Sequence, residues 1–167
     1  MMMQVQNMIV INQKIDLIWK VLAQDFAHVH RWASPVKHSY ALSDAQAPFE
    51  GRVCQFTQKE NGLAAIEKIT HMAPQAFEIS FSVEPVNAPI VFPLKNNSVA
   101  IKLTDLGKQK TQVDWCCDIN LKPAAKLFSP LLRMGMKASF NALLKELKDY
   151  SEQQVENVQV EQALLIK

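Results

Sequence analysis

Residues 110–150 read KTQVDWCCDINLKPAAKLFSPLLRMGMKASFNALLKELKDY, and the spacing of their apolar side chains changes part-way along. In the first twelve residues apolar and polar side chains alternate, and the apolar ones are Val113, Trp115, Cys117 and Ile119. This alternation is typical of a strand in an antiparallel sheet with one dry and one wet face. Residues 124–150 instead have the longer period of a helix. The stretch therefore predicts a sheet followed by a helix that can cover its dry face.

The rest of the chain predicts more strands of this kind. Turns with Gly, Pro or Asn-Gly separate the expected strands, which span residues 5–12, 36–44, 52–58, 63–72, 76–84, 97–106 and 110–121. Two short helices are expected between the first two strands, one beginning near Ile15 and one over residues 24–30. An antiparallel sheet this long must curl, and only the final helix is long enough to cover its concave face. The sequence therefore predicts an α+β fold.

The expected final helix has one broad face of apolar and small residues. At about 100° per residue, this face contains Phe128, Leu131, Leu132, Gly135, Ala138, Ser139, Ala142 and Leu143. A basic stripe lies opposite it and contains Lys126, Arg133, Lys137 and Lys148. A helix of about 40 Å cannot follow a curved sheet along its whole length, and small residues leave room where the two part. We therefore expect a cavity there; the alternative is that large residues opposite, such as Phe81 and Trp115, fill the gap.

Composition and charge exclude several classes of protein. The chain has 167 residues, of which 49% are hydrophobic and 20% charged, as in an ordinary globular protein. Its net charge of +2 is too small to indicate a nucleic-acid partner, and no apolar run approaches the ~18 residues of a membrane span. The N-terminus lacks a signal-peptide pattern, and the adjacent Cys116 and Cys117 argue against a disulfide framework. We therefore expect a cytoplasmic protein without stable membrane insertion.

The chain divides into one expected domain over residues 1–151 and a tail over residues 152–167. The tail is polar until its last few residues, which are apolar. Three alternatives stay open for the tail: it is disordered, it prolongs the helix, or it docks on a second copy of the chain in a homodimer.

His28 and His30 are the first candidates for a metal site. In a helix their side chains point about 200° apart and cannot hold one ion. In an extended segment they share a face, but the third ligand that zinc requires is missing. A solvated helix end is the favoured interpretation. The sequence also lacks a glycine-rich phosphate loop and the G-x-S-x-G and H-E-x-x-H motifs, so it predicts no metal and no cofactor.

The order of these segments resembles the START-like, or SRPBCC, superfamily. The resemblance covers roughly residues 5–150 and rests on the final helix and on IVINQKIDLIWKVLAQDFAHVHRWASPV (9–36), FEGRVCQFTQKENGLAAIEKITHMAPQAFEISFSV (49–83) and TQVDWCCDI (111–119). Within it, WKVLAQDF and EKI are similar to the branch of polyketide cyclase/dehydrase and lipid-transport proteins. The resemblance implies a helix-grip, in which a seven-stranded antiparallel sheet wraps around the C-terminal helix and encloses an apolar pocket. The two short helices would plug one end of the sheet.

Glu67 is the most informative charged residue. The alternation in LAAIEKITHM (63–72) allows two registers, one with Glu67 facing inward and one with Lys68 facing inward, and it does not decide between them. The resemblance implies the first register, because the matching glutamate of abscisic-acid receptors faces the pocket. A buried carboxylate needs a partner or a raised pKa. Glu67 could then orient a ligand hydroxyl, or act as a general base if the protein is a cyclase; it is the one weak catalytic candidate.

The expected ligand-binding wall combines the sheet and the helix. The sheet would supply Phe77, Ile79, Phe81, Val99, Ile101, Val113, Trp115 and Cys117. The helix would supply Leu132, Gly135, Ser139 and Leu143, and Trp32 would close one end. Glu67 and Ser139 would orient the ligand. The proline-containing loop over residues 84–97 either closes the pocket as a lid or packs on the sheet edge.

Three functions are compatible with this pattern. The favoured one is binding, with or without transport, of a hydrophobic small molecule or lipid in the pocket, driven by apolar burial. The first alternative is an enzyme of the polyketide cyclase or dehydratase type with Glu67 as its base. The second is a module that binds a protein partner through the tail and the basic stripe, around a packed pocket.

Overall fold

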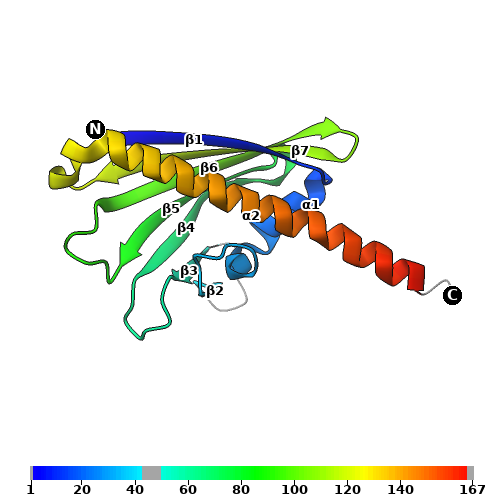
Figure 1. The fold of residues 1–167 in the computed structure, drawn as a ribbon, viewed down its shortest axis with the longest axis horizontal. Coiled ribbons are helices and arrows are strands. Elements are labelled where there is room, and N and C mark those ends of the chain that lie inside the picture. Colours follow the sequence, from blue (N-terminus) through cyan, green and yellow to red (C-terminus); the bar gives the residue numbers. More distant parts are fainter. Residues whose placement is uncertain (1, 43–49, 165–167) are drawn as a thin grey trace.

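The computed structural model describes residues 2–42 and 50–164, which contain one antiparallel sheet of seven strands (Figure 1). The strands lie in the order β1-β7-β6-β5-β4-β3-β2. Their bounds are Met2–Ile11 (β1), His38–Ala41 (β2), Gly51–Gln55 (β3), Ala64–Ala73 (β4), Glu78–Val86 (β5), Leu94–Gly107 (β6) and Lys110–Leu121 (β7). The long helix α2, Ser129–Leu164, crosses the sheet beside β1 and continues past it (Figure 1). The predicted α+β helix-grip fold is confirmed.

Three short helical segments plug one end of the concave face. They follow β1 as α1 (Ile15–Trp19), the π-helical η1 (Lys20–Gln24) and the 3₁₀-helical η2 (Phe26–Arg31). Their large apolar side chains, Ile18, Trp19, Leu22 and Phe26, are buried in the same core as the inward faces of the central strands. Side chains therefore fill this end of the curled sheet.

The two histidines of η2 have separate environments. His28 is exposed, at a position whose φ of −106° is not helical, whereas His30 is half-buried. The Ser39 hydroxyl of β2 lies 2.7 Å from His30 Nδ1 and donates to the Ala27 carbonyl at 2.7 Å. Burial, followed by the charges of neighbouring His38 and His28, lowers the pKa of His30. His30 thus joins η2 to β2, which differs from the solvated helix end that the sequence favoured.

The orientation of α2 differs from the expected one. Phe128 and Leu131, expected to face the sheet, are 57% and 63% exposed, whereas Leu144 and Leu147 are fully buried. The helix is turned by roughly a third of a revolution from the predicted face. Large side chains fill the concave face better than small ones, and the inward residues are Met136, Phe140, Leu143, Leu144 and Leu147.

Several boundaries also differ from the expected ones. The helix predicted from residue 124 begins as a 3₁₀ segment, η4 (Pro123–Phe128), before α2. Strand β6 begins at Leu94 rather than residue 97, because Leu94 pairs with Leu121 of β7. Phe77 precedes β5 and has a left-handed backbone with φ of 52°. Strand β2 is shorter than the predicted 36–44, and residues 43 and 44 lie outside the described residues.

Hydrogen bonds hold α2 on the sheet most densely between residues 146 and 152. Val10 of β1, Asn12 directly after β1 and Ser34 in the linker after η2 bind side chains there, in the pairs Ser34–Glu146 (2.8 and 2.6 Å), Val10–Lys148 (2.8 Å) and Asn12–Glu152 (2.7 Å). Closer to the start of α2, the Asn7 side-chain amide donates to the Lys137 carbonyl at 3.1 Å. The later turns are therefore fixed at more points than the earlier ones.

Candidate functional site

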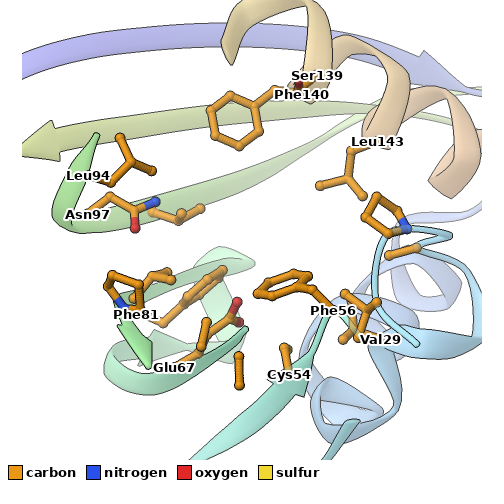
Figure 2. Close-up of a pocket in the computed structure, with 18 of the residues that line it drawn as sticks. Val29, Cys54, Phe56, Glu67, Phe81, Leu94, Asn97, Ser139, Phe140 and Leu143 are labelled. Carbon is orange, nitrogen blue, oxygen red and sulfur yellow. The ribbon is translucent and has the colours of Figure 1, made fainter. Parts of the chain in front are cut away.

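A cavity of about 270 Å³ lies between the concave face of the sheet and α2 (Figure 2). Strands β3 to β7, η2 with the linker after it, the β5–β6 loop and α2 all supply side chains to its wall. Most of these side chains are apolar, such as Val29, Phe56 and Phe140. The volume is close to the lower end of the ~300–1,000 Å³ range of ligand pockets. The gap that the sequence suggested between helix and sheet is present.

Seven of the predicted wall residues line this cavity, and seven do not. The residues that line it are Trp32, Glu67, Phe81, Val99, Trp115, Ser139 and Leu143. The structure places the others outside it, and these are Phe77, Ile79, Ile101, Val113, Cys117, Leu132 and Gly135. The cavity therefore occupies only part of the predicted site.

Four of the excluded residues lie at the plugged end of the sheet. Ile79, Ile101 and Val113 face inward as expected, but they are buried in the packed core that the short helices complete. Phe77 packs edge-on against Trp19 of α1, with ring centroids 5.7 Å apart. The predicted wall extended too far along the strands because the reach of the plug is not visible in the alternation of a strand.

The other three predicted residues lie outside the cavity for different reasons. Cys117 is buried behind Asn97, whose side-chain amide donates to its sulfur at 3.3 Å, and burial raises the pKa of Cys117 to about 11. Leu132 packs on the margin of the core. A Cβ at Gly135 would meet no atom within 4 Å, so this glycine faces open space. The small residue that was expected to leave room inside lies on the outer side of α2.

A buried ion pair between Arg52 and Glu67 is the main polar feature of the wall. These residues face each other across β3 and β4, and both are less than a tenth exposed. Arg52 Nη2 and Nε lie 2.6 and 2.7 Å from Glu67 Oε2. The carboxylate points toward the cavity (Figure 2). Because each charge has an opposite charge beside it, the pair can stay ionised in an apolar wall.

The plug helps to hold this ion pair in place. Arg52 Nη1 donates to the Phe26 carbonyl at 2.6 Å, and the guanidinium carbon lies 3.9 Å from the Phe26 ring centre. Both ends of the guanidinium are therefore engaged, one by Glu67 and one by η2. Burial, followed by the charge of Glu67, raises the pKa of nearby Cys54 to about 12. The Cys54 thiol therefore stays protonated near neutral pH and is not an activated nucleophile.

Arg52 was missed by the sequence reasoning, although a signal for it was present. Arg52, Cys54 and Phe56 recur at every second residue and all line the cavity. The two strands of this hairpin and its Asn61-Gly62 turn were predicted, and together they bring Arg52 opposite Glu67. Opposite charges at facing positions of a predicted hairpin indicate a cross-strand pair. Met136 and Phe140 were missed because the predicted face of the helix was turned.

Two tryptophans place indole N–H groups inside the cavity wall. The indole nitrogens of Trp32 and Trp115 are buried and have no hydrogen-bond partner among the described residues. Buried donors without a partner are uncommon and cost free energy. Both residues line the cavity, so this wall contains donors as well as the Arg52–Glu67 pair.

Half-buried lining residues lie beside the β5–β6 loop and the first turns of α2, and they are Phe92, Leu94, Met136 and Phe140. We call this side the mouth; Val36, Phe56 and Leu63, in the linker after η2 and beside the β3–β4 turn, are half-buried lining residues as well. In the loop, Phe92 faces the cavity, whereas Ile90 and Val91 are 96% and 89% exposed. Lys122 fixes the loop, because its backbone N–H donates to the Pro93 carbonyl at 2.9 Å. The loop thus supplies one side chain to the mouth, and whether it moves as a lid stays a prediction.

Residues 2–152 match the family described as polyketide cyclase / dehydrase and lipid transport. The chain belongs to this family. The match covers every residue named above in the cavity wall. The suspected membership of the START-like superfamily is therefore confirmed, while a family that includes both enzymes and transport proteins leaves the activity open.

Solved structures with the same fold are similar to the chain at low sequence identity. A START superfamily protein from Mycobacterium smegmatis is 14% identical, with a TM-score of 0.73 over 90% of this chain and 98% of that one. The aromatase/cyclase Zhui from a Streptomyces species is 16% identical, with a TM-score of 0.72 over 93% and 96%. Ara h 8.0201 is 10% identical, with a TM-score of 0.71 over 92% and 99%. No curated protein matches the sequence.

Proposed function

We propose that this protein binds a hydrophobic small molecule or lipid in the cavity between the sheet and α2. The observation that carries the proposal is a mostly apolar cavity of about 270 Å³ with one buried ion pair in its wall. Each Å² of apolar ligand surface removed from water contributes roughly 25 cal/mol. A cavity of this size argues against the alternative in which the pocket is packed with side chains.

The polar groups of the wall favour a ligand that is apolar along most of its length and has at least one oxygen. The Glu67 carboxylate accepts a hydrogen bond from a ligand hydroxyl, and the Asn97 side chain also lines the cavity. A few placed polar groups in an apolar wall are typical of sites that orient a ligand. Ser139 lies at the mouth, where its hydroxyl already donates to the Gly135 carbonyl at 3.0 Å.

An enzyme of the cyclase or dehydratase type is the second candidate, because Glu67 and Arg52 both reach the cavity. A step in which Glu67 takes up a proton would leave the buried guanidinium without its counter-ion, which is costly. This arrangement favours binding over proton transfer. Glu67→Gln separates the two candidates. It should lower the ligand affinity of a binding protein by a limited factor, but it should abolish the turnover of an enzyme that uses Glu67 as its base.

The direct test is to purify the protein from its own host and to analyse it by native mass spectrometry and organic extraction. We expect a co-purifying apolar compound in a one-to-one complex.

A second test measures the uptake of a fluorescent apolar probe by two matched variants. Ser139→Phe places a ring at the mouth and should lower uptake at least tenfold, whereas Gly135→Leu, one turn away in open space, should not. Equal uptake by the two variants would contradict the proposal.

A further inference from the structure

Strand β1 forms one edge of the sheet and lacks the features that usually protect an edge strand (Figure 1). Natural edge strands are short, carry charged side chains or proline, or are bent by a bulge, and these features prevent pairing with another chain. β1 spans ten residues, Met2–Ile11, without a charged residue or a proline, and it pairs with β7 without a register shift. The opposite edge strand, β2, has only four residues. Of the two edges, the β1 edge is therefore the one suited to a further strand.

The backbone groups on the free side of β1 belong to its even-numbered residues. In an antiparallel strand, successive residues direct their N–H and C=O groups alternately to the two sides. The Lys148 ammonium of α2 binds the Val10 carbonyl on the free side at 2.8 Å. The Asn12 N–H, of the same parity, donates to the Glu152 carboxylate at 2.7 Å. Among the residues that the structure describes, no hydrogen bond reaches the corresponding groups of Met2, Gln4, Gln6 and Met8. Hydrogen bonds from α2 therefore close only one end of this edge.

The exposed side chains of this open stretch are arranged symmetrically. They lie on the outer face of the sheet, and they are Met2, Gln4, Gln6 and Met8. The two methionines are 58% and 57% exposed although they are large and apolar. The Gln6 side-chain amide donates to the Gln4 side-chain oxygen at 3.0 Å. The order Met-Gln-Gln-Met reads the same in both directions about the buried Val5, so this strand can meet a copy of itself with similar side chains opposite each other.

We propose that β1 pairs with β1 of a second copy of the chain, in antiparallel orientation and around a twofold axis at Val5. The two sheets then join into one continuous sheet, which is an isologous contact. Gln4 lies opposite Gln6 of the second copy, and Met2 lies opposite its Met8. The open residues form about eight hydrogen bonds across the axis, and cross-strand pairs of like polarity add to them. A shift of the register by two residues would set glutamine against methionine.

The charges around β1 are compatible with a second copy. β1 itself brings no charge into the contact. On the outer face, the nearest charges are Asp114 and Asp118 of β7, and they lie about three strand spacings, roughly 14 Å, from β7 of the second copy. On the concave face, Arg133 and Lys137 of α2 lie beside β1, and their exposed charges are screened at physiological salt.

The size of the contact indicates a weak dimer. It involves residues 2–8 of each copy and is smaller than a standard protein interface, so we expect a dissociation constant in the micromolar range. An unrelated strand would use the same backbone groups, but it would not account for the symmetry of the exposed side chains. The contact lies outside the cavity and does not require a bound ligand.

Sedimentation velocity of the full chain at increasing concentration tests the pairing. We expect a reversible equilibrium between monomer and dimer. Gln4→Lys/Gln6→Lys places like charges directly opposite each other and should weaken the dimer about tenfold or more. The control Ser98→Lys/Ala100→Lys adds the same charges to exposed positions of β6, which lie in line with Gln4 and Gln6 on the same face of the sheet. This control should dimerise as the unmodified chain does.

A charge exchange tests the register directly. The Gln4→Glu/Gln6→Glu variant should also dimerise weakly by itself. Mixed with the Gln4→Lys/Gln6→Lys variant, it should form a dimer at least as tight as that of the unmodified chain, because opposite charges then face each other. Failure of the two variants to associate, while each is folded, would overturn the proposed register.

Amide hydrogen exchange of the unmodified chain gives a test that does not depend on any variant. The N–H groups of Gln4, Gln6 and Met8 should exchange rapidly in dilute solution and become protected where the dimer forms. Those of Met3 and Val5 face β7 and should be protected at both concentrations. A chain that stays monomeric at about 1 mM, a dimer that both lysine variants weaken equally, or a dimer in which Gln4 and Gln6 stay unprotected would overturn the proposal.

Discussion

Arg52 and Glu67 form an ion pair in the wall of the cavity, with Nη2 and Oε2 only 2.6 Å apart and both side chains buried. The two residues are fifteen positions apart in the chain and become neighbours because β3 and β4 pair in register. One charge neutralises the other in a place that water does not reach easily. The stability of the fold and the chemistry of the cavity therefore depend on the same two side chains.

Removing one partner of this pair should cost much more than replacing both. Glu67→Leu or Arg52→Met alone leaves a buried charge without its partner, and we expect a loss of about 3–5 kcal/mol in the free energy of unfolding. The double variant should lose clearly less than either single variant, with a residual cost from the Phe26 carbonyl that Arg52 no longer binds. Urea unfolding of the four proteins measures this. Additive losses would contradict it.

The orientation of α2 gives a second prediction. Leu147→Ala removes a fully buried side chain and should lower the free energy of unfolding by about 2–5 kcal/mol. Leu131→Ala removes an equally large side chain from the outer side and should change it by less than about 0.5 kcal/mol. Both alanines suit a helix, so they form a matched pair. A larger loss at Leu131 would restore the face that the sequence predicted.

The attachment of α2 to the turn after β1 should weaken in acid. Burial alone would raise the pKa of Glu152, but the hydrogen bond from the Asn12 backbone and the ammonium of Lys148 outweigh it, and the pKa lies below its ordinary value of 4.5. The carboxylate therefore stabilises the fold at pH values above 4.5, and this contribution is lost as the pH falls through the lowered pKa. The stability difference between the unmodified chain and Glu152→Gln should be within about 1 kcal/mol at pH 7 and smaller at pH 3. Glu60→Gln, at the exposed β3–β4 turn, serves as the control. A difference that grows in acid would count against this assignment.

The three thiols should react in a fixed order. Burial raises the pKa of Cys54 to about 12 and that of Cys117 to about 11, so little thiolate exists at pH 8. Burial also raises the pKa of Cys116, but this residue is only half-buried on the outer side of β7. Peptide mapping after iodoacetamide treatment should find Cys116 labelled first in the native protein and all three labelled after unfolding. Rapid labelling of native Cys54 would show that the cavity wall opens to solvent.

The sheet could be predicted because its strands alternate clearly. Ile79 and Phe81 point inward as expected, and so do Val113 and Trp115, since a period of two leaves few alternatives for a half-buried strand. The start of β6 was less visible because Lys95, Asn96 and Asn97 are polar, although they pair with β7 or lie beside it. Polar residues at the edge of a cavity weaken the very pattern that identifies a strand.

The site was harder to predict than the fold. In α2 apolar residues surround much of the helix, so the 3.6-residue period gave a face with Gly135 in place of the one with Met136. The extent of the cavity depends on how far Trp19 and Phe26 reach along the strands, which is a property of packing rather than of local sequence. Arg52 required the register of a hairpin to be combined with the charge of Glu67. Each of these features joins segments that are distant in the chain.

The two halves of α2 are attached to the rest of the fold to different extents. Ser34, Val10 and Asn12 hold the turns from Glu146 to Glu152. The turns over the mouth are held by the Asn7 side chain and, through η4, by the covalent link to β7. We therefore expect a guest larger than the cavity to displace the turns over the mouth before those from Glu146 to Glu152, while the seven strands keep their register.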